Sequence, residues 1–170
     1  LGDDFLASVC KDWEAATAPA SDVGVQVTHL RTGLVLSTEG GLLPKLLLPF
    51  RLGLGGKLGR GRHWMSWISL DDYIEAVCHL ATDLSLPGAV NMVSPSPVTN
   101  EEFTDILANI LRRPAMIPVP SFALRFAMGE MAEETALASQ RVRPHRLLEA
   151  NFHYQQPTLD KALRHLLTEH

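Results

Sequence analysis

The chain alternates between segments in which apolar residues recur at helical spacing and segments in which they alternate with polar residues. Residues 5–18 have apolar side chains three to four positions apart, which predicts an amphipathic helix that ends at Pro19. Residues 25–30 alternate and are rich in β-branched side chains, which predicts a strand. Thr99 and Glu102 have the spacing of a capping box, which opens a helix through Ile110.

The remaining elements follow from the same two periods. We expect strands at 64–68, 89–93 and 152–154, and helices at 42–52, 73–83, 121–128, 131–139, 144–150 and 159–166. Asp71 or Asp72 is interpreted as the N-cap of helix 73–83 rather than as a carboxylate pair for acid–base chemistry. Alternation of helix and strand predicts an α/β protein with a doubly wound parallel sheet, followed after about Asn100 by a mostly helical part.

Charge and cysteine usage narrow the classes of function. With 15 basic and 19 acidic residues the formal net charge is −4, so neither nucleic acid nor a membrane is an expected partner. Cys10 and Cys78 lie on apolar helical stripes, which predicts buried free thiols in a reducing compartment. The sequence shows no apolar run long enough to span a bilayer, no signal peptide and no metal-binding spacing of His or Cys. A cytoplasmic protein is therefore the default expectation.

Several short motifs occur in a fixed order along the chain. They are Gly2–Ala7 with Trp13–Ala16, Leu30–Leu36, Pro49–Gly56 with Gly59 and Gly61, Trp67–Asp72, Asn91–Pro95 with Val98–Phe103, Arg113–Pro114, Pro118–Pro120, Gly129–Glu130 and Gln140–Val142. In this order and at this spacing they resemble the epimerase-like family of atypical extended short-chain dehydrogenases/reductases whose members end in a domain labelled DUF1731. The resemblance covers essentially the whole chain.

This resemblance implies a Rossmann domain that binds NADP (or NAD), followed by a substrate-side domain. Residues 1–99 then correspond to the C-terminal part of the Rossmann-like domain with a substrate loop, and residues 100–170 to a small helical domain. In such proteins the glycine turn that holds the pyrophosphate follows the first strand, and the present sequence does not contain that region. Because the first residue is Leu1, we expect the natural start to lie upstream, and cofactor binding to require that N-terminal half.

The segment after strand 25–30 carries the expected cofactor contacts. Arg31, Thr32 and Gly33 lie at the carboxyl end of this strand, which is the edge where doubly wound sheets bind ligands. In the resembling family the backbone here passes the nicotinamide end of the cofactor, and Val35 falls at the matching place. The alternative interpretation is a strand that simply continues into a turn.

The stretch 53–61 contains five glycines but lacks the spacing and the strand–turn–helix context of a pyrophosphate site. Two interpretations stay open, a flexible loop beside the substrate cleft and a structural crossing loop. In the first, Gly55 and Gly56 let the backbone approach a substrate. Arg62 then offers a guanidinium to a diphosphate, and Trp67 offers a ring for stacking. In the second, these residues are a solvated loop and a core aromatic.

The acid–base pair of the superfamily, a tyrosine followed four residues later by a lysine, is absent from helix 5–18. Lys11 is the lysine of this helix, and position 7 is alanine. The catalytic residues are therefore unknown from the sequence. The segment Gln140–Pro144 is interpreted as a basic surface cluster at a helix end rather than as a phosphate contact.

Three hypotheses on function follow. The first is the C-terminal portion of an NADP-dependent, nucleotide-sugar-epimerase-like oxidoreductase with a small-molecule substrate, for which a nucleotide sugar is the leading candidate. The second is a degenerate member that binds a dinucleotide or metabolite without turnover, which the missing tyrosine–lysine pair motivates. The third is a regulatory module, because some members of the resembling family carry a cell-division label. A homodimer is left open in each case.

Overall fold

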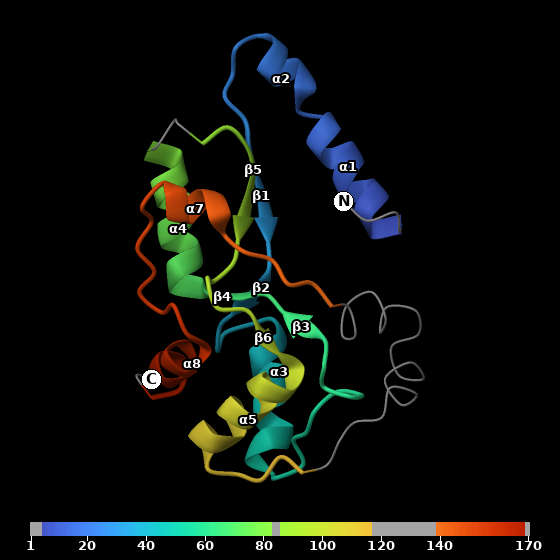
Figure 1. Cartoon of the computed structure of the whole chain (residues 1–170), viewed down its shortest axis with the longest axis vertical. Coiled ribbons are helices and arrows are strands. Elements are labelled where there is room, and N and C mark those ends of the chain that lie inside the picture. Colours follow the sequence, from blue (N-terminus) through green and yellow to red (C-terminus); the bar gives the residue numbers. More distant parts are fainter. Residues whose placement is uncertain (1–4, 83–85, 117–138, 169–170) are drawn as a thin grey trace.

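The computed structural model describes residues 5–82, 86–116 and 139–168. The helices are α1 (Phe5–Ala15), α2 (Ala18–Asp22), α3 (Leu42–Arg51), α4 (Leu70–Thr82), α5 (Asn100–Leu111), α7 (His145–Glu149) and α8 (Leu159–Thr168). The strands are β1 (Thr28–Thr32), β2 (Leu34–Leu36), β3 (Trp64–Met65), β4 (Trp67–Ser69), β5 (Gly88–Met92) and β6 (Val98–Thr99). Figure 1 shows β1 and β5 towards one end of the molecule and α3, α5 and α8 gathered at the other end.

One extended stretch of chain passes from one parallel strand pair to the next. β1 pairs with β5, and β2, which follows it directly, pairs with β4, both in parallel. Gly33 lies at the change of partner. Its N–H donates to the carbonyl of Met92 in β5, and the N–H of Leu34 donates to the carbonyl of Ser66 beside β4. The short strands β3 and β6 form a separate antiparallel pair.

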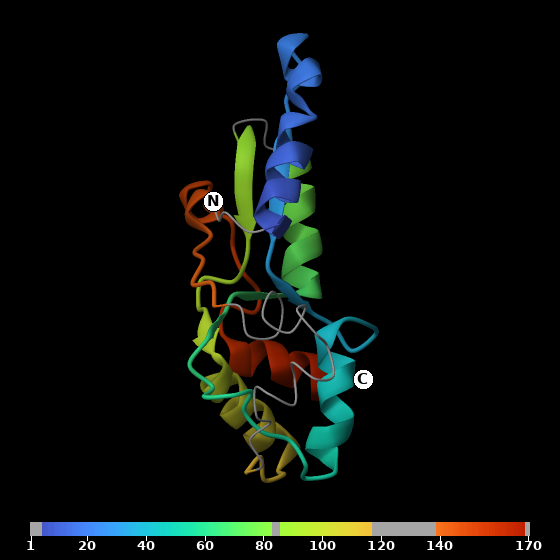
Figure 2. The same cartoon turned by 90° about the vertical axis from the view of Figure 1, so that its right-hand side faces the viewer.

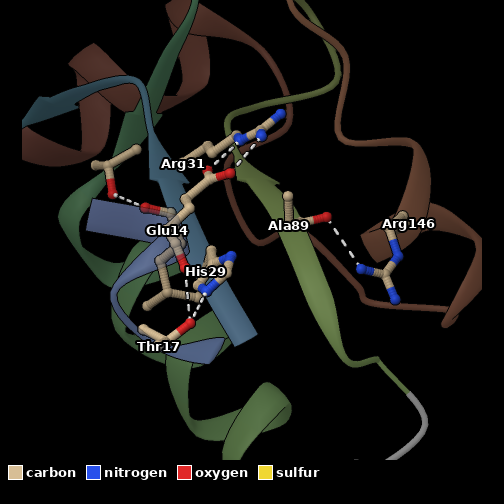
Figure 3. A network of polar contacts seen from close by, with 8 residues as sticks. Glu14, Thr17, His29, Arg31, Ala89 and Arg146 are labelled. Atoms are coloured by element: carbon tan, nitrogen blue, oxygen red, sulfur yellow. Dashed lines mark hydrogen bonds and ion pairs between the residues drawn. The ribbon is translucent and has the colours of Figure 1, made fainter. Parts of the chain in front are cut away.

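The outer edge of β5 is covered by the chain itself. The guanidinium of Arg146 in α7 donates a hydrogen bond to the carbonyl of Ala89 at 3.0 Å, which Figure 3 shows. The side-chain amide of Asn91 donates to the carbonyl of Arg143 at 3.2 Å. Polar side chains and α7 thus occupy this edge, so the sheet does not extend beyond β5.

The opposite edge of the pair belongs to β1, and no strand in the described ranges pairs with it. The carbonyl of Val27 and the N–H of Gly33 are bonded to the β5 side. Alternation along the strand therefore directs the backbone groups of Thr28, Leu30 and Thr32 towards the open edge. Parallel sheets are normally buried and contain more strands than two, and this edge is where further strands can pair.

Helices cover both faces of the β1–β5 pair. The side chain of Arg31 reaches Glu14 in α1, and that of His29 reaches Thr17, the N-cap of α2. Thr32, one position after Arg31, reaches Tyr73 in α4. Figures 1 and 2 agree in placing α1 and α4 on opposite sides of the two strands. Parallel pairing with helices on both faces confirms the predicted α/β class and the doubly wound arrangement.

Two apolar clusters form the core. The larger one joins β2, α3 and β4 to α5 and α8, with Trp67 and Phe103 as its largest fully buried side chains. The second joins α4, β5 and α7 around Val90 and Leu147. The larger cluster contains residues from both sides of the predicted boundary at 99/100. The helical part is therefore packed directly against the end of the sheet.

Three expectations from the sequence are wrong in detail. Asp72 does not cap α4, because that helix begins one turn earlier and Ser69 accepts the hydrogen bond from the Asp72 N–H at 3.2 Å. Residues 152–154 are not a strand. Cys10 and Cys78 are exposed thiols rather than buried ones.

Other expectations are confirmed, are shifted along the chain, or concern residues outside the described ranges. The capping box is present, with the Thr99 hydroxyl accepting from the Glu102 N–H and the Glu102 carboxylate accepting from the Thr99 N–H. The first strand lies slightly later than predicted, at Thr28–Thr32. The motif at 118–120, the helix predicted at 121–128 and most of the helix predicted at 131–139 lie outside the described residues. Among the described helices, none combines the length and apolarity needed to cross a membrane.

Candidate functional site

The carboxyl ends of β1 and β5 meet at the strand switch, and Gly33 is fixed there by packing. A methyl group on Gly33 would lie 2.6 Å from the carbonyl oxygen of Ser66 and 2.6 Å from Cγ1 of Val93. The position therefore has no room for a side chain, whatever its role toward a ligand. In open parallel sheets the crevice at the carboxyl ends of the strands is the usual ligand site, so this switch is the place where one is expected.

Arg31 lies in β1 but its guanidinium is held by α1. Its Nε and Nη2 donate to the two carboxylate oxygens of Glu14 at 2.7 and 2.8 Å, a bidentate pair visible in Figure 3. Hydrogen bonding to Arg31 lowers the pKa of the Glu14 carboxyl below its ordinary value. Thr17, the N-cap of α2, makes a further contact of 2.8 Å with His29 in β1. Arg31 thus fastens α1 to the sheet, and a contact with a cofactor stays a prediction.

Thr32 ends β1 and faces a hydroxyl that the sequence did not single out. Its Oγ1 lies 3.4 Å from the phenol oxygen of Tyr73, in the first turn of α4. Both hydroxyls lie at the carboxyl edge, because α4 begins immediately after β4 ends. Val35, the remaining predicted cofactor contact, is half-buried in β2 opposite Ile68. The sequence alone could not find Tyr73, since its pairing spans 41 positions.

The carboxyl ends of β4 and β5 are covered by residues 154–157. The Asp72 carboxylate, fully buried, accepts the N–H groups of Gln155 and Gln156 at 2.7 and 3.0 Å. Ser94, just after β5, donates to the carbonyl of Pro157 at 3.0 Å. The Tyr154 hydroxyl donates to the carbonyl of Val93 at 2.8 Å. Among the described residues, this segment, called the strap below, leaves the end of β1 and the strand switch as the open part of the carboxyl edge.

The glycine-rich stretch is attached to the N-terminus of α5. The Leu58 N–H donates to the side chain of Asn100 at 2.7 Å, and the N–H groups of Asn100 and Glu101 donate to carbonyls of His63 and Gly61. Lys57 and Glu101 form an ion pair at 2.6 Å, which lowers the pKa of the Glu101 carboxyl. These contacts favour the crossing-loop interpretation for residues 57–63. Burial lowers the pKa of the His63 imidazole at its end.

The predicted substrate contacts have different surroundings. Gly55 is buried against the ring of Phe50, and a methyl group there would lie 2.6 Å from that ring. Gly56 is also buried. Trp67 has no exposed surface, and its indole N–H donates to the carbonyl of Ser96 at 3.0 Å. Arg62 is exposed. Packing explains the first three, while their contact with a substrate stays a prediction.

Trp64 and Arg141 form a contact that the sequence reasoning missed. The guanidinium carbon of Arg141 lies 4.4 Å from the centroid of the Trp64 ring, within the range of a cation–π interaction. Ser66 holds the segment that carries Arg141, because its hydroxyl donates to the carbonyl of Gln140 at 2.6 Å and accepts from the N–H of Val142 at 2.9 Å. The three groups come from β3, the position between β3 and β4, and a segment over 70 positions later.

The described residues show no group of three His, Cys, Asp or Glu side chains that could hold a metal ion. A shallow cavity of about 280 Å³ lies beside the Lys57–Glu101 pair and is lined by Thr104, Asp105, Ala115 and Met116 as well. None of the predicted site residues lines it. The polar groups that the fold brings together are therefore at the carboxyl edge and around Trp64.

Parallel strand pairs with helices on both faces and a change of partner at Gly33 define a Rossmann-type α/β protein. Residues 119–166 match the family described as Domain of unknown function (DUF1731). The chain is 42% identical, over 98% of its length, to an epimerase family protein of Mycobacterium leprae, and 37% identical over 98% to a chloroplastic epimerase family protein of Arabidopsis thaliana. It covers 54% and 47% of those two proteins.

Solved structures agree with these relatives. The human epimerase family protein SDR39U1, crystallised with NADPH, superposes with a TM-score of 0.80 at 35% identity over 84% of this chain and 48% of that one. A nucleoside-diphosphate sugar epimerase from Corynebacterium glutamicum gives 0.79 at 41% identity, over 98% of this chain and 31% of that one. A UDP-glucose 4-epimerase of Thermus thermophilus, crystallised with NAD, shares the fold at 15% identity with a TM-score of 0.63.

The resemblance predicted from the motifs is thus confirmed. The chain carries a match to DUF1731 and is a relative of epimerase family proteins, to whose C-terminal portion it corresponds. It spans about half the length of the curated relatives it matches.

Proposed function

We propose that the chain is the substrate-side portion of an NAD(P)-dependent, nucleotide-sugar-epimerase-like oxidoreductase. The observation that carries the proposal is the strand switch at Gly33, whose carboxyl edge stays open at β1 while the strap covers β4 and β5. A ligand crevice at this edge needs a second wall beyond β1. The relatives' names and the NADPH in the human structure supply the class of cofactor.

The surface beyond β1 is suited to such a wall. The open backbone edge lies beside α1, which has no buried residue even though Phe5, Leu6 and Trp13 are among its side chains. Exposed apolar side chains beside the unpaired edge of a parallel strand are typical of a surface that other elements cover. Further parallel strands and their helices would complete the sheet there and bring the dinucleotide-binding turn to the carboxyl edge.

The residues at the edge fit a nicotinamide cofactor in chemical type. Thr32 and Tyr73 offer hydroxyls for hydrogen bonds beside Gly33 at the strand switch. A bound nicotinamide would supply hydride transfer. In this proposal Thr32, Gly33 and Val35 line the nicotinamide end, whereas Arg31 positions α1 through Glu14.

For the substrate we propose an anionic, nucleotide-like compound. Arg62 and Arg141 are exposed, and the Trp64 ring already carries the Arg141 guanidinium. Guanidinium groups bind diphosphates through paired hydrogen bonds, and an aromatic ring stacks on a base or a sugar. Arg62, Gly55, Gly56 and Trp67 remain the predicted substrate contacts, and Arg141 with Trp64 is added to them here.

A second candidate function, binding without turnover, rests on the tyrosines. The chain contains two, Tyr73 and Tyr154, and neither lies in α1. Tyr154 already donates to the carbonyl of Val93 in the strap. Among the tyrosines of this chain, Tyr73 is therefore the one left for acid–base chemistry at the carboxyl edge. If the Tyr73→Phe variant of a chimera that turns over a sugar nucleotide kept full activity, Tyr73 would have no part in the chemistry.

Cofactor binding tests the main proposal directly. We would titrate NADPH into the chain alone and into a chimera in which the unmatched portion of the Mycobacterium leprae relative precedes it. The chimera is expected to bind NADPH, and the chain alone is not, because the pyrophosphate-binding turn is supplied by the added portion. A folded chimera with no measurable affinity for NADPH or NADH would refute the proposal.

The substrate class is tested by a separate binding experiment on the same chimera. The affinity of the chimera for UDP is expected to fall at least severalfold in Arg141→Ala and in Arg62→Ala, because each removes a guanidinium from a diphosphate site. Arg164→Ala is the matched control, since Arg164 is an exposed arginine paired with Asp160 in α8. Equal losses in all three variants would indicate a general charge effect and not a site. Conversion of a sugar nucleotide by the chimera would exclude the candidate without turnover.

A further inference from the structure

The outward face of α3 combines exposed leucines with unpaired cations. Leu43, Leu47 and Phe50 point into the core, whereas Leu48 and Leu52 are 66% and 64% exposed and lie four positions apart on the other side. Leu54, just beyond, is 56% exposed. Lys45 and Arg51 are also exposed, and among the described side chains neither has a carboxylate partner. The five exposed residues, Leu48, Leu52, Leu54, Lys45 and Arg51, are together called the α3 face below.

The sequence that contains this face carries charged residues of one sign. From Gly40 to Leu70 the sequence has no acidic residue, and it has five basic ones, Lys45, Arg51, Lys57, Arg60 and Arg62. The formal net charge of the whole chain is −4. The positive charge is therefore local, and the expectation of no membrane partner, which was drawn from the net charge, does not describe this surface.

A neighbouring loop adds to the same end of the molecule. Gly53 follows α3 and lies against Pro114, 3.8 Å from the position its Cβ would take to the Pro114 ring. Pro114 is preceded by Arg112 and Arg113, both exposed at the C-terminal end of α5. Figure 2 shows α3 along the outer side of the molecule, and Figure 1 shows β1 towards the opposite end. The α3 face is thus remote from the edge proposed to receive further strands.

We infer that the α3 face docks on an anionic lipid surface. Exposed leucines flanked by lysine and arginine on one helix are the composition of an interfacial helix, in which apolar side chains enter the headgroup region and cations meet anionic lipids. Neither described cavity includes any residue of this face. A flat lipid surface fits it better than an acidic peptide, which binds in a groove.

Vesicle sedimentation with the 170-residue chain tests this inference. The chain is expected to pellet with vesicles of phosphatidylcholine containing about one third phosphatidylserine, and not with phosphatidylcholine alone. The double variant Leu48→Gln, Leu52→Gln is expected to lose most of this binding. The single variant Arg51→Gln is expected to bind the vesicles severalfold more weakly than the unmodified chain. Added salt should weaken binding, because the cationic contribution is screened.

A matched control distinguishes binding by the α3 face from nonspecific binding by any exposed apolar side chain. Ile74 is 51% exposed on α4, and Ile74→Gln is expected to bind vesicles as the unmodified chain does. Circular dichroism of each variant checks that it is folded. The inference is overturned if the folded chain does not pellet with anionic vesicles, if Ile74→Gln and the double leucine variant bind equally, or if the leucine variants change only the oligomeric state. None of these outcomes depends on the binding of NADPH.

Discussion

The buried carboxylate of Asp72 accepts the backbone N–H of Gln155 at 2.7 Å, across 83 positions of the sequence. Its second oxygen accepts the N–H of Gln156, whose side-chain oxygen in turn accepts from the Ser69 hydroxyl at 2.9 Å. A carboxylate without exposure is stable only when hydrogen bonds replace its water. Asp72 therefore joins the start of α4 to the strap that precedes α8, and the strap decides which part of the carboxyl edge stays open.

Replacing Asp72 by Asn is expected to destabilise the fold by about 2–4 kcal/mol, because one strap N–H loses its acceptor and faces an amide donor in a buried place. Urea unfolding followed by circular dichroism measures the loss. Asp71→Asn is the control, since Asp71 is exposed and pairs with His165 at 3.0 Å, and its effect is expected to be under about 1 kcal/mol. Similar losses in the two variants would contradict the role assigned to the strap.

Tyr154 gives the strap a dependence on alkaline pH. Burial, together with the charge of Asp72, raises the pKa of the Tyr154 phenol above its ordinary value. The folded state thus holds the proton more tightly than the unfolded state, so stability is fully present below the unfolded pKa of about 10 and declines as the pH rises above it. In Tyr154→Phe this decline should become smaller, and the loss of the hydrogen bond to Val93 should cost about 1 kcal/mol at neutral pH.

The measurement for Tyr154 is the free energy of unfolding from pH 7 to pH 11 in both proteins. If the free energy of unfolding declined equally with pH in both proteins over that whole range, Tyr154 would not set the alkaline limit of stability. A smaller slope in the variant, with an unchanged denaturant dependence, is the expected result.

Gly33→Ala tests the strand switch. The added methyl group would lie 2.6 Å from two atoms, one of them a backbone oxygen, so β2 or β4 must move. Overpacking of this kind costs about 1–3 kcal/mol, which thermal unfolding would detect. Gly40→Ala is the matched control, because nothing lies within 4 Å of its Cβ position. An unchanged melting temperature in Gly33→Ala would mean that the two strand pairs are not held together as described.

Local signals in the sequence were sufficient for many of the elements. The capping box at Thr99 and Glu102 spans three positions, and the amphipathic repeat of α4 depends on one helix only. The sequence also reveals the family, because its motifs depend on order rather than on contacts. These features are encoded within a few residues, so no tertiary information is needed to find them.

The candidate site could be predicted less well from the sequence, because it depends on contacts between residues that are far apart in the chain. Asp72 has the position expected of a helix cap, and only the fold shows that its carboxylate serves the strap. Arg31 has the position of a ligand contact, and only the fold brings Glu14 to its guanidinium. Apolar spacing placed Cys10 and Cys78 on inward stripes, yet both are exposed in the structure. Periodicity identifies an apolar stripe on a helix, but it does not show whether other elements of the fold cover that stripe.

The pair formed by Glu14 and Arg31 is expected to control the attachment of α1. This helix has no buried residue, so its attachment relies on polar contacts with β1 such as this pair, and the contact of Thr17 with His29 fixes the chain just after the helix. In Glu14→Gln the amides of residues 5–15 should exchange hydrogen faster than in the unmodified chain, by less than about tenfold, since a partly exposed ion pair contributes under about 1 kcal/mol. Exchange followed by mass spectrometry at pH 7 measures this directly.

The sign of the pH dependence follows from the lowered pKa of Glu14. The contribution of the pair is present above the unfolded pKa of about 4.3, and it is lost as the pH falls through the lower folded value. The difference between the variant and the unmodified chain, compared at equal pH, should therefore be largest near neutrality and vanish in acid. Arg164→Gln removes an exposed ion pair in α8 and should leave exchange in α1 unchanged. A difference that persists undiminished at pH 2 would show that Glu14 acts on α1 through packing and not through its charge.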